Sequence, residues 1–445
     1  MKKTILIAFL TFALSANAQE IKSLSLKEAI SYALENKADA KKAKLKVENS
    51  EYQIQEIRSR ALPQISANGG LTYNPIIQTT VIDGESFGAP GTLIQAAFGQ
   101  KWTSVAGVSL SQALFDQTVF TGLKAARSTR EFYQINEQLT EEQVIERVAN
   151  NYYQVYVQRQ KLNVIDSNYV NTTKVKNIIK GQFDNGLAKK IDLDRILVKI
   201  SNINTLRQQV LNAVQLQENA LKFYMGMPIE SSINIPQTAF EVSPQTLSES
   251  PNTANRNEFL ILKKQEELLI FQKKADQAAY YPTLSLTGSY NYFGQGPVVP
   301  LGAGPGDKVY WSDFSAIGLN LRVPIFTGFG TRSKVRQADV NIRSIQEDIK
   351  DTKLALDLAF LNSRTQIENS LITIKNQKDN SQLAKEVLDN TRNNYVQGLA
   401  SLTDLLDAEN ALTEAQNNYT AALLDYKLAE IQLIKSKGEL RNLLN

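Results

Sequence analysis

The chain has 445 residues, with 49 Lys and Arg against 45 Asp and Glu, and it contains neither histidine nor cysteine. The missing residue types exclude Ser-His-Asp and Cys-His nucleophile systems, His-liganded zinc, disulfides and an N-terminal lipidated cysteine. Most hydrolase, redox and metalloenzyme designs are thereby excluded, although chemistry by carboxylates or lysine is not. We expect no enzyme, no cofactor and no bound metal.

Residues 1–18 have the pattern of a secretory signal peptide. Lys2 and Lys3 precede an apolar run from Ile5 to Leu14, and the triplet Ala16-Asn17-Ala18 follows. This run is shorter than the roughly 20 residues of a transmembrane helix, so we expect cleavage after the triplet and export. Without the two lysines the excess of basic over acidic residues is only two, and nothing in the charge points to nucleic acid.

Long stretches without proline or glycine predict two helical hairpins. Residues 123–180 and 331–397 contain neither residue type. Each stretch leads into a glycine-containing turn, at 181–187 and at 395–400, and then into a second stretch free of both. Because proline and glycine are the chief helix interrupters, we expect a long helix, a tip turn and a shorter helix in each case. At 1.5 Å per residue the longer helices would reach roughly 90 to 100 Å.

The two halves of the chain also share sequence. Phe183-Asp-Asn-Gly-Leu-Ala aligns with Tyr395-Val-Gln-Gly-Leu-Ala at an offset of 212 residues, and other matches fall at nearly the same offset. A constant offset predicts a tandem internal repeat. We expect a first repeat at 19–226, a proline-marked linker at 227–258 and a second repeat at 259–445. Each repeat runs helix, β-hairpin, long helix, tip turn, helix.

The last helix carries a heptad of large residues, with alanines at the alternate seam position. The large residues are Leu405, Leu412, Tyr419, Tyr426 and Leu433. A seam of this kind predicts close, left-handed coiled-coil packing with a structural role.

Alternation of apolar and polar residues predicts β-hairpins at about 62–115 and 282–325. The strictest alternation is at 283–292, and a loop rich in glycine and proline joins the strands of each pair. Aromatic residues gather near the loop ends of the strands. A soluble sandwich would also alternate, but strands of about 9–11 residues with interfacial aromatics are typical of outer membrane barrels.

Four such strands cannot close a barrel in a bilayer. Open sheet edges are excluded from hydrocarbon, and single-chain barrels begin at about eight strands. We therefore expect several copies to contribute two hairpins each to one barrel. Their helices would form a second hollow cylinder, and the common axis would be a conduit.

With these features the chain resembles the TolC-like outer membrane efflux proteins, also called outer membrane factors. The resemblance rests on the repeat and on the segments Asn185-Gly-Leu187, Tyr395-Val-Gln-Gly-Leu399 and Leu402-Thr-Asp-Leu-Leu-Asp-Ala-Glu409. It implies a membrane β-barrel plus a long α-helical coiled-coil barrel. The family's form is a homotrimer with a twelve-stranded barrel in the outer membrane of a Gram-negative bacterium and an α-barrel in the periplasm. Residues 227–258 match its equatorial linker.

The resemblance also implies partners and a function. Family members dock a periplasmic adaptor (membrane fusion) protein at the helix tips, with an inner membrane RND or ABC transporter behind it. The adaptor-contacting turns would be Gly186-Leu187 and Gly398-Leu399, whose glycines also read as plain helix caps. The channel would then be the passive outer membrane duct of a tripartite efflux system. A type I protein secretion duct, a non-conducting coiled-coil scaffold and an uptake porin are the alternatives.

Two aspartates match the family's pore-tip carboxylates. Asp404 and Asp407 of three copies would form a ring of six carboxylates that attracts cations. The segment Ser401-Leu-Thr-Asp404 is also a helix-capping pattern, so Asp404 has an ordinary structural explanation as well.

A second pair matches the residues that hold the family's tips together. These are Tyr395 and Asp192. The basic residue that relatives carry just after the second tip glycine is replaced by Ala400 in this chain. Lys189, Lys190 and Arg195 are all candidates to replace it.

Overall fold

The computed structural model describes residues 24–88, 90–236 and 253–444. The expected signal peptide at 1–18 and the middle of the expected linker lie outside the described residues. Within the described residues no helix has the length and apolarity needed to cross a bilayer.

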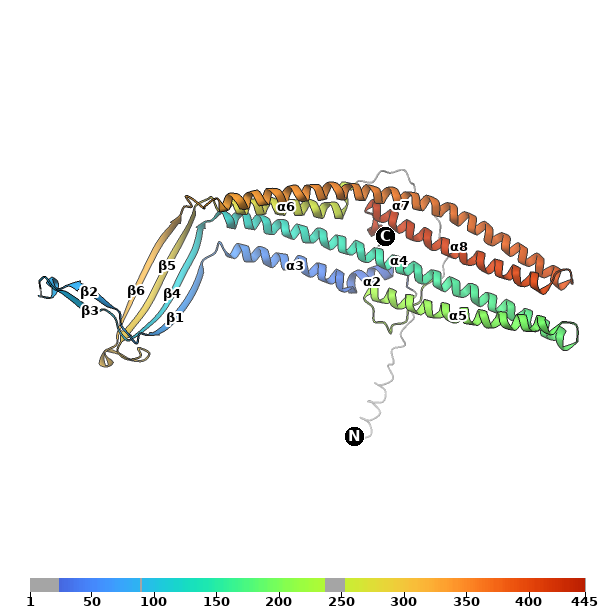
Figure 1. Cartoon of the computed structure of the whole chain (residues 1–445), viewed down its shortest axis with the longest axis horizontal. Helices are drawn as coiled ribbons and strands as arrows, with labels where there is room; N and C mark the ends of the chain where they lie inside the picture. The colour runs from blue at the N-terminus through green and yellow to red at the C-terminus, as the bar shows by residue number, and fades with distance from the viewer. Residues whose placement is uncertain (1–23, 89, 237–252, 445) are drawn as a thin grey trace, which may run out of the picture. The chain divides into compact units, whose positions relative to one another are not determined.

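Long helices dominate the described part of the chain. Its seven α-helices are α2 (Leu26–Asn36), α3 (Ala38–Ser59), α4 (Gln117–Asp184), α5 (Lys190–Met225), α6 (Asn257–Ala278), α7 (Gly330–Val396) and α8 (Leu402–Lys437). Four short 3-10 helices accompany them: η1 (Gly84–Phe87), η2 (Thr253–Asn255), η3 (Pro305–Asp307) and η4 (Leu440–Leu444). Helix α4 exceeds the glycine-free stretch because it includes Gly122 and Gly181. In Figure 1, α5 folds back along the end of α4, and α8 folds back along the end of α7.

Contacts between residues divide the chain into two compact units. The helical unit comprises the described residues of Met1–Val47, Tyr133–Lys263 and Asp348–Asn445. The strand unit comprises those of Glu48–Phe132 and Lys264–Glu347.

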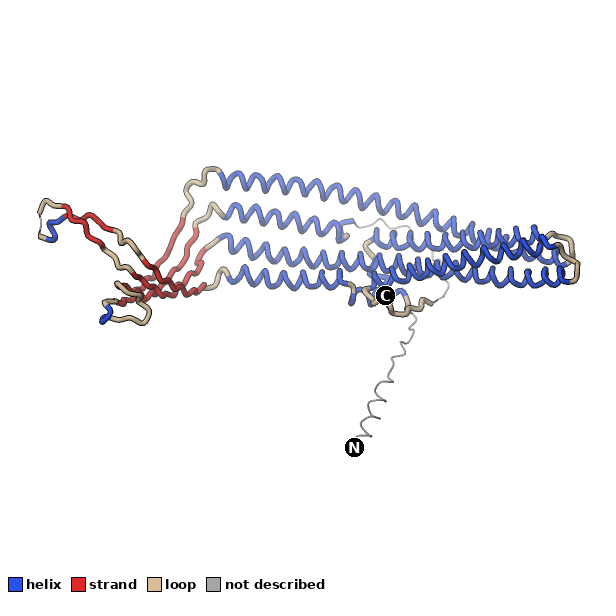
Figure 2. Tube along the Cα trace, turned by 60° about the horizontal axis from the view of Figure 1, so that its bottom comes forward, coloured by secondary structure: helices blue, strands red, loops and turns tan. Residues whose placement is uncertain are grey.

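The strand unit contains a four-stranded antiparallel sheet in the order β1-β4-β5-β6 (Figure 2). Its strands are β1 (Gln64–Tyr73), β4 (Trp102–Phe115), β5 (Thr283–Gly296) and β6 (Tyr310–Arg322). Aromatic side chains pair across the strands near the loops: the ring centroids of Tyr73 and Trp102 are 4.6 Å apart. Those of Tyr292 and Trp311 stack at 4.7 Å.

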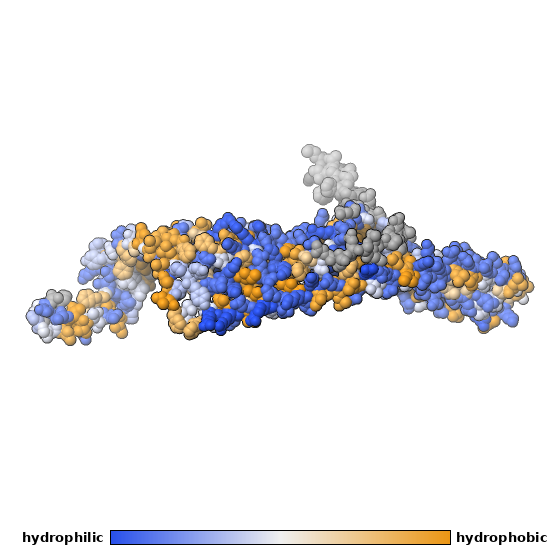
Figure 3. Space-filling model, turned by 90° about the horizontal axis from the view of Figure 1, so that it is seen from above, coloured by the Kyte–Doolittle hydropathy of each residue, from blue (hydrophilic) through white to orange (hydrophobic). Residues whose placement is uncertain are grey.

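The sheet is open and many of its apolar side chains are exposed. Strand β6 is at one edge, and its Ile317, Leu319 and Leu321 are 87%, 67% and 63% exposed. Figure 3 shows hydrophobic residues gathered over the strands. The four strands of this sheet therefore do not close into a barrel.

The loop between β1 and β4 contains a second hairpin that the sequence did not lead us to expect. Strands β2 (Thr79–Asp83) and β3 (Leu93–Ala97) pair in antiparallel register. Each has only five residues, which is too short for alternation to stand out against the glycine and proline of a loop.

The helical unit is held by apolar cores between its helices. Helix α2 starts with a capping box in which Ser25 and Glu28 exchange hydrogen bonds. Its Ile30 is fully buried in a cluster with residues of α4, α5 and α8. A second cluster joins α7 to the heptad face of α8, where Tyr426 and Leu433 are each 1% exposed. The heptad therefore packs as the sequence predicts.

Candidate functional site at the helix tips

Both helical hairpins turn through the same backbone motif. The φ angles of Gly186 and Gly398 are 73° and 77°, a left-handed conformation that costs L-residues with a side chain about 1–2 kcal/mol. In each turn the glycine N–H donates to the carbonyl three residues earlier, at 2.9 and 3.0 Å. The N–H of the next residue, Leu187 or Leu399, donates to the carbonyl five residues earlier, at 2.8 Å in both turns. This is the Schellman motif, and it makes each reversal sharp.

The leucine after each tip glycine points into solvent. Leu187 is 81% exposed and Leu399 is 75% exposed. The same motif ends α5 at Gly226, but there the following residue, Met227, packs against the core. A packed apolar residue at this position is the usual companion of the motif. The tips therefore present two apolar side chains that the chain itself does not cover.

A small apolar core lies just behind the tips and joins the two hairpins. It contains Val175 and Ile179 of α4, Ile196 of α5, Leu388 of α7, and Leu402, Leu405 and Ala408 of α8. Because both hairpins contribute, separating the tips would expose this core to water.

Asp192 and Tyr395 lie close to each other at the edge of that core. Burial is the main cause that raises the pKa of Tyr395, and the nearby Asp192 carboxylate adds to it. In the described part of the chain no hydrogen bond joins the two side chains. The structure therefore places the two residues near each other without a hydrogen bond between them.

Arg195 provides a direct link between the hairpins. Its Nη1 donates to Oγ1 of Thr403 at 3.3 Å and lies 4.0 Å from Oδ1 of Asp192. Lys189 and Lys190, the other two candidates for the missing basic residue, are exposed. Lys189 stands at the N-cap of α5 without a side-chain capping bond.

Asp404 and Asp407 occupy the first two turns of α8, and both are exposed. Oδ2 of Asp404 accepts hydrogen bonds from the backbone N–H of Ser401 at 2.8 Å and from its hydroxyl at 2.7 Å. The Asp404 N–H returns a bond to Ser401 Oγ, which completes a capping box. These hydrogen bonds hold the pKa of Asp404 below its usual value, so the carboxylate stays charged in mild acid.

Sequence reasoning missed a polar cluster about two turns from the start of α8. Glu409 is only 3% exposed, and its Oε2 accepts a hydrogen bond from Oγ1 of the fully buried Thr172 of α4 at 3.3 Å. Lys199 of α5 donates to Oδ1 of the neighbouring Asn410. The only sequence signal was a glutamate directly after Ala408, a seam alanine of the heptad.

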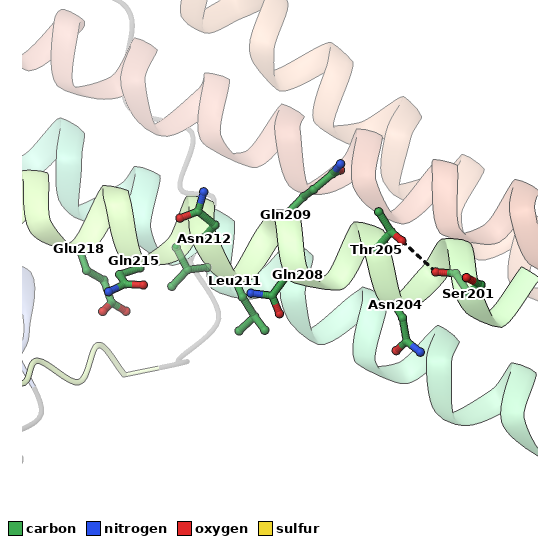
Figure 4. Close-up of a pocket in the computed structure, with 10 residues that line it drawn as sticks. Ser201, Asn204, Thr205, Gln208, Gln209, Leu211, Asn212, Gln215 and Glu218 are labelled. Atoms are coloured by element: carbon green, nitrogen blue, oxygen red, sulfur yellow. Dashed lines mark hydrogen bonds between the residues drawn. The ribbon is translucent and has the colours of Figure 1, made fainter.

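A surface groove of about 910 Å³ runs along one face of α5 (Figure 4). Its lining is mostly serine, threonine, asparagine and glutamine of that single helix, and Thr205 Oγ1 donates to the Ser201 carbonyl at 3.1 Å. The groove's one carboxylate, Glu218, pairs with Arg159 at 2.6 Å. It therefore lacks the convergent reactive groups of an active site. The described residues also hold no group of His, Cys, Asp or Glu that could bind a metal ion.

Comparison with known proteins assigns the family. A model of the family described as outer membrane efflux protein matches residues 29–227 and 255–439. The chain belongs to the outer membrane efflux protein family. Outer membrane protein TolC of Vibrio cholerae is 24% identical over 98% of this chain and 96% of the relative. Alkaline protease secretion protein AprF of Pseudomonas aeruginosa is 23% identical over 84% of this chain and 76% of the relative.

Solved channels share the fold of this efflux protein. The CmeC outer membrane channel of Campylobacter jejuni matches with a TM-score of 0.75 at 17% identity, over 96% of this chain and 90% of that one. The outer membrane protein VceC of Vibrio cholerae matches with a TM-score of 0.72 at 16% identity, over 93% and 96%. At these identities the likeness shows the fold alone.

Membership of the family confirms the predicted function and location. The protein is an outer membrane efflux channel of a Gram-negative bacterium, and its relatives include proteins named for efflux and for alkaline protease secretion. Those homologues are channel proteins rather than enzymes.

Proposed function

We propose that three copies of this efflux protein form one conduit, with a twelve-stranded barrel in the outer membrane and a barrel of helices in the periplasm. The observation that carries the proposal is the open sheet β1-β4-β5-β6, whose strands β1 and β6 each pair on one side only within the described residues. An unpaired edge cannot stand in hydrocarbon, and barrels need about eight strands or more. Three copies supply twelve.

The long helix α7 supports the same assembly. Along its helical-unit part, Leu354, Leu358, Leu361, Ile372 and Leu383 are all 58% or more exposed. They are separated by 4, 3, 11 and 11 residues, intervals close to whole helical turns, so they lie along one stripe. In a single chain this apolar stripe is exposed to water. A neighbouring copy that covered it would gain about 25 cal/mol of free energy for each Å² of apolar surface buried.

The tips are the proposed docking and gating region. Gly186-Leu187 and Gly398-Leu399 would contact a periplasmic adaptor protein, with an RND or ABC transporter of the inner membrane behind it. The two exposed leucines offer apolar surface that docking would bury. Asp404 and Asp407 would ring the periplasmic entrance, and Asp192 with Tyr395 would hold the tips together.

Arg195 takes the place of the basic residue that Ala400 replaces. Its hydrogen bond to Thr403 joins α5 to α8, whereas the contact between Asp192 and Tyr395 joins α5 to α7. Substrate would pass through the conduit unchanged, selected by the pump.

Reconstitution tests the proposal. Native mass spectrometry of the purified mature chain should give a trimer, and planar bilayers containing it should show discrete conducting steps. A monomer, or a trimer that never conducts, would contradict the proposal; the second result is the one expected of a non-conducting scaffold. Crosslinking of the chain in cells, followed by identification of the captured pump, separates drug or ion efflux from type I protein secretion.

A further inference from the structure

Glu409 is a carboxylate buried at the junction of the two hairpins, behind the tips. Its Oε2 has one donor, the Thr172 hydroxyl at 3.3 Å, which is shared with Oδ1 of Asn168 at 3.0 Å. Its Oε1 is buried without a hydrogen-bond partner in the described structure. A charged carboxylate prefers several donors, and a buried oxygen left without one is costly. The site therefore suits an uncharged glutamic acid better than a glutamate.

The groups that face Glu409 come from every surrounding helix. Helix α4 offers the uncharged Thr172, α5 offers Lys199 and α7 offers Arg392, while Asp407 of α8 interacts with Lys199. Lys199 and Arg392 favour the charged form of Glu409, but no ion pair joins either of them to it among the described contacts. Lys199 itself is partly desolvated, which lowers its pKa.

Burial has the larger effect on the carboxyl group. It raises the pKa of Glu409 above the ordinary value of 4.5, and the Thr172 hydrogen bond, Arg392 and Lys199 offset this only in part. A raised pKa means that the packed arrangement binds the proton more tightly than a separated one. Packing is therefore most stable below the ordinary value and loses stability as the pH rises through the raised one.

The position of Glu409 connects its charge to the tips. Three further hydrogen bonds link α8 to the first hairpin around it: Arg195 to Thr403, Lys199 to Asn410, and Asn168 to Thr413 at 2.9 Å. Glu409 lies within this series, two turns from the start of α8. A change that weakens the packing around Glu409 therefore weakens the contact between α8 and the first hairpin, which keeps the tips together.

We propose that Glu409 is a positioning residue for the gate at the helix tips. In its neutral form it keeps α8 packed against α4 and α5, and loss of its proton weakens this packing and favours opening of the tips. The inference rests on the proposed function, because a gate requires a conducting channel. It adds a control of opening by periplasmic pH to that function.

The first test is the pH profile of mean conductance in planar bilayers, from about pH 5 to pH 8. Wild-type conductance should rise with pH by roughly three- to tenfold, since one titrating group changes an equilibrium by at most tenfold per pH unit. Glu409→Gln, a neutral isostere, should stay at the low acid value throughout. The matched control is Glu142→Gln. Glu142 is another buried carboxyl with a raised pKa, bonded to Asn257 away from the tips, so its profile should follow the wild type.

A second variant keeps the inference testable if Glu409→Gln fails to assemble. Thr172→Val is nearly isosteric and removes the hydrogen bond that favours the charged form. The midpoint of the conductance rise should therefore move to higher pH, while Thr172→Ser should restore it. A pH profile that is unchanged in Glu409→Gln, or a midpoint that moves the other way in Thr172→Val, would overturn the inference.

Infrared spectroscopy separates this result from failure of the proposed function. In the wild-type trimer the carbonyl band of a protonated carboxylic acid should persist above the pH at which an exposed glutamic acid loses it, and the band should lose intensity in Glu409→Gln. A trimer that does not conduct but shows this band contradicts the channel proposal alone. A conducting trimer whose band is the same in both proteins contradicts the role of Glu409 alone.

Discussion

Nη1 of Arg195 donates a hydrogen bond to Oγ1 of Thr403 at 3.3 Å, and this contact joins the second turn of α5 to the first turn of α8. The two residues are 208 positions apart in sequence, and each follows one of the two tip turns. The link therefore ties the two hairpins to each other where an entrance at the tips would open.

Arg195→Ala should raise the conductance of the reconstituted channel. An exposed polar link of this kind changes the ratio of open to closed states by roughly twofold to fivefold, and more if three copies act together. Single-channel recording in planar bilayers is the measurement. Arg195→Lys should have a smaller effect because it keeps the charge. Lys189→Ala, at the same tip, should leave the conductance unchanged. An equal rise in Lys189→Ala would mean that positive charge at the tip, and not the hydrogen bond of Arg195, sets the conductance.

Tyr395→Phe should also raise conductance, but by less than Arg195→Ala. The hydroxyl makes no hydrogen bond to Asp192 in the described structure, so its removal loses only the weak interaction of the hydroxyl dipole with its surroundings, whereas the ring keeps its packing against the tip core. Recordings of both variants under one salt condition give the comparison. A larger effect from Tyr395→Phe would mean that the closed trimer forms a hydrogen bond that the single chain lacks.

Asp404→Asn combined with Asp407→Asn should weaken block of the channel by divalent cations. Loss of six carboxylates around an entrance should raise the half-blocking concentration by roughly tenfold or more. Titration of the current with a divalent cation measures it. Because the pKa of Asp404 is held below its usual value, block of the wild type should persist at pH 5. Equal block of wild type and double variant would remove both residues from the pore.

Leu187→Ser combined with Leu399→Ser should weaken adaptor binding and leave the trimer and its conductance intact. Burial of each leucine on docking contributes about 1.5–3 kcal/mol, so the pair should change affinity by a hundredfold or more. Crosslinking to the adaptor in cells, with purified trimer as the assembly control, is the readout. Leu216→Ser is the matched control, since this leucine of α5 is 62% exposed and lies away from the tips. Weaker crosslinking by the control would point to a different docking surface.

The sequence predicts what local rules decide. The long stretches without proline or glycine locate both tip turns, because each stretch ends near the glycine that adopts the left-handed conformation of the turn. Alternation finds β1, β4, β5 and β6, whose strands are long enough for the period to show. It misses β2 and β3, which are five residues each.

Side-chain partners across distant segments are a different matter. The sequence offers three candidates for the basic residue that is missing at Ala400: Lys189, Lys190 and Arg195. Only the packing of α5 on α8 distinguishes them. In the heptad pattern Glu409 has the position of a polar surface residue, and only the packing of α4 on α8 shows that it is buried. Such contacts depend on the angle between helices that meet more than two hundred residues apart in sequence, and no local rule fixes that angle.

The capping of α5 and α8 has a consequence for which tip yields first. Helix α8 starts with a complete box between Ser401 and Asp404, whereas α5 starts at Lys189 with no side chain to hold its first amides. The first turn of α5 should fray more readily, and its amide protons should exchange with deuterium sooner than those after Ser401. Two tip turns of nearly identical backbone therefore differ in the local stability of the helix that follows them, and the less stable helix start belongs to the first hairpin.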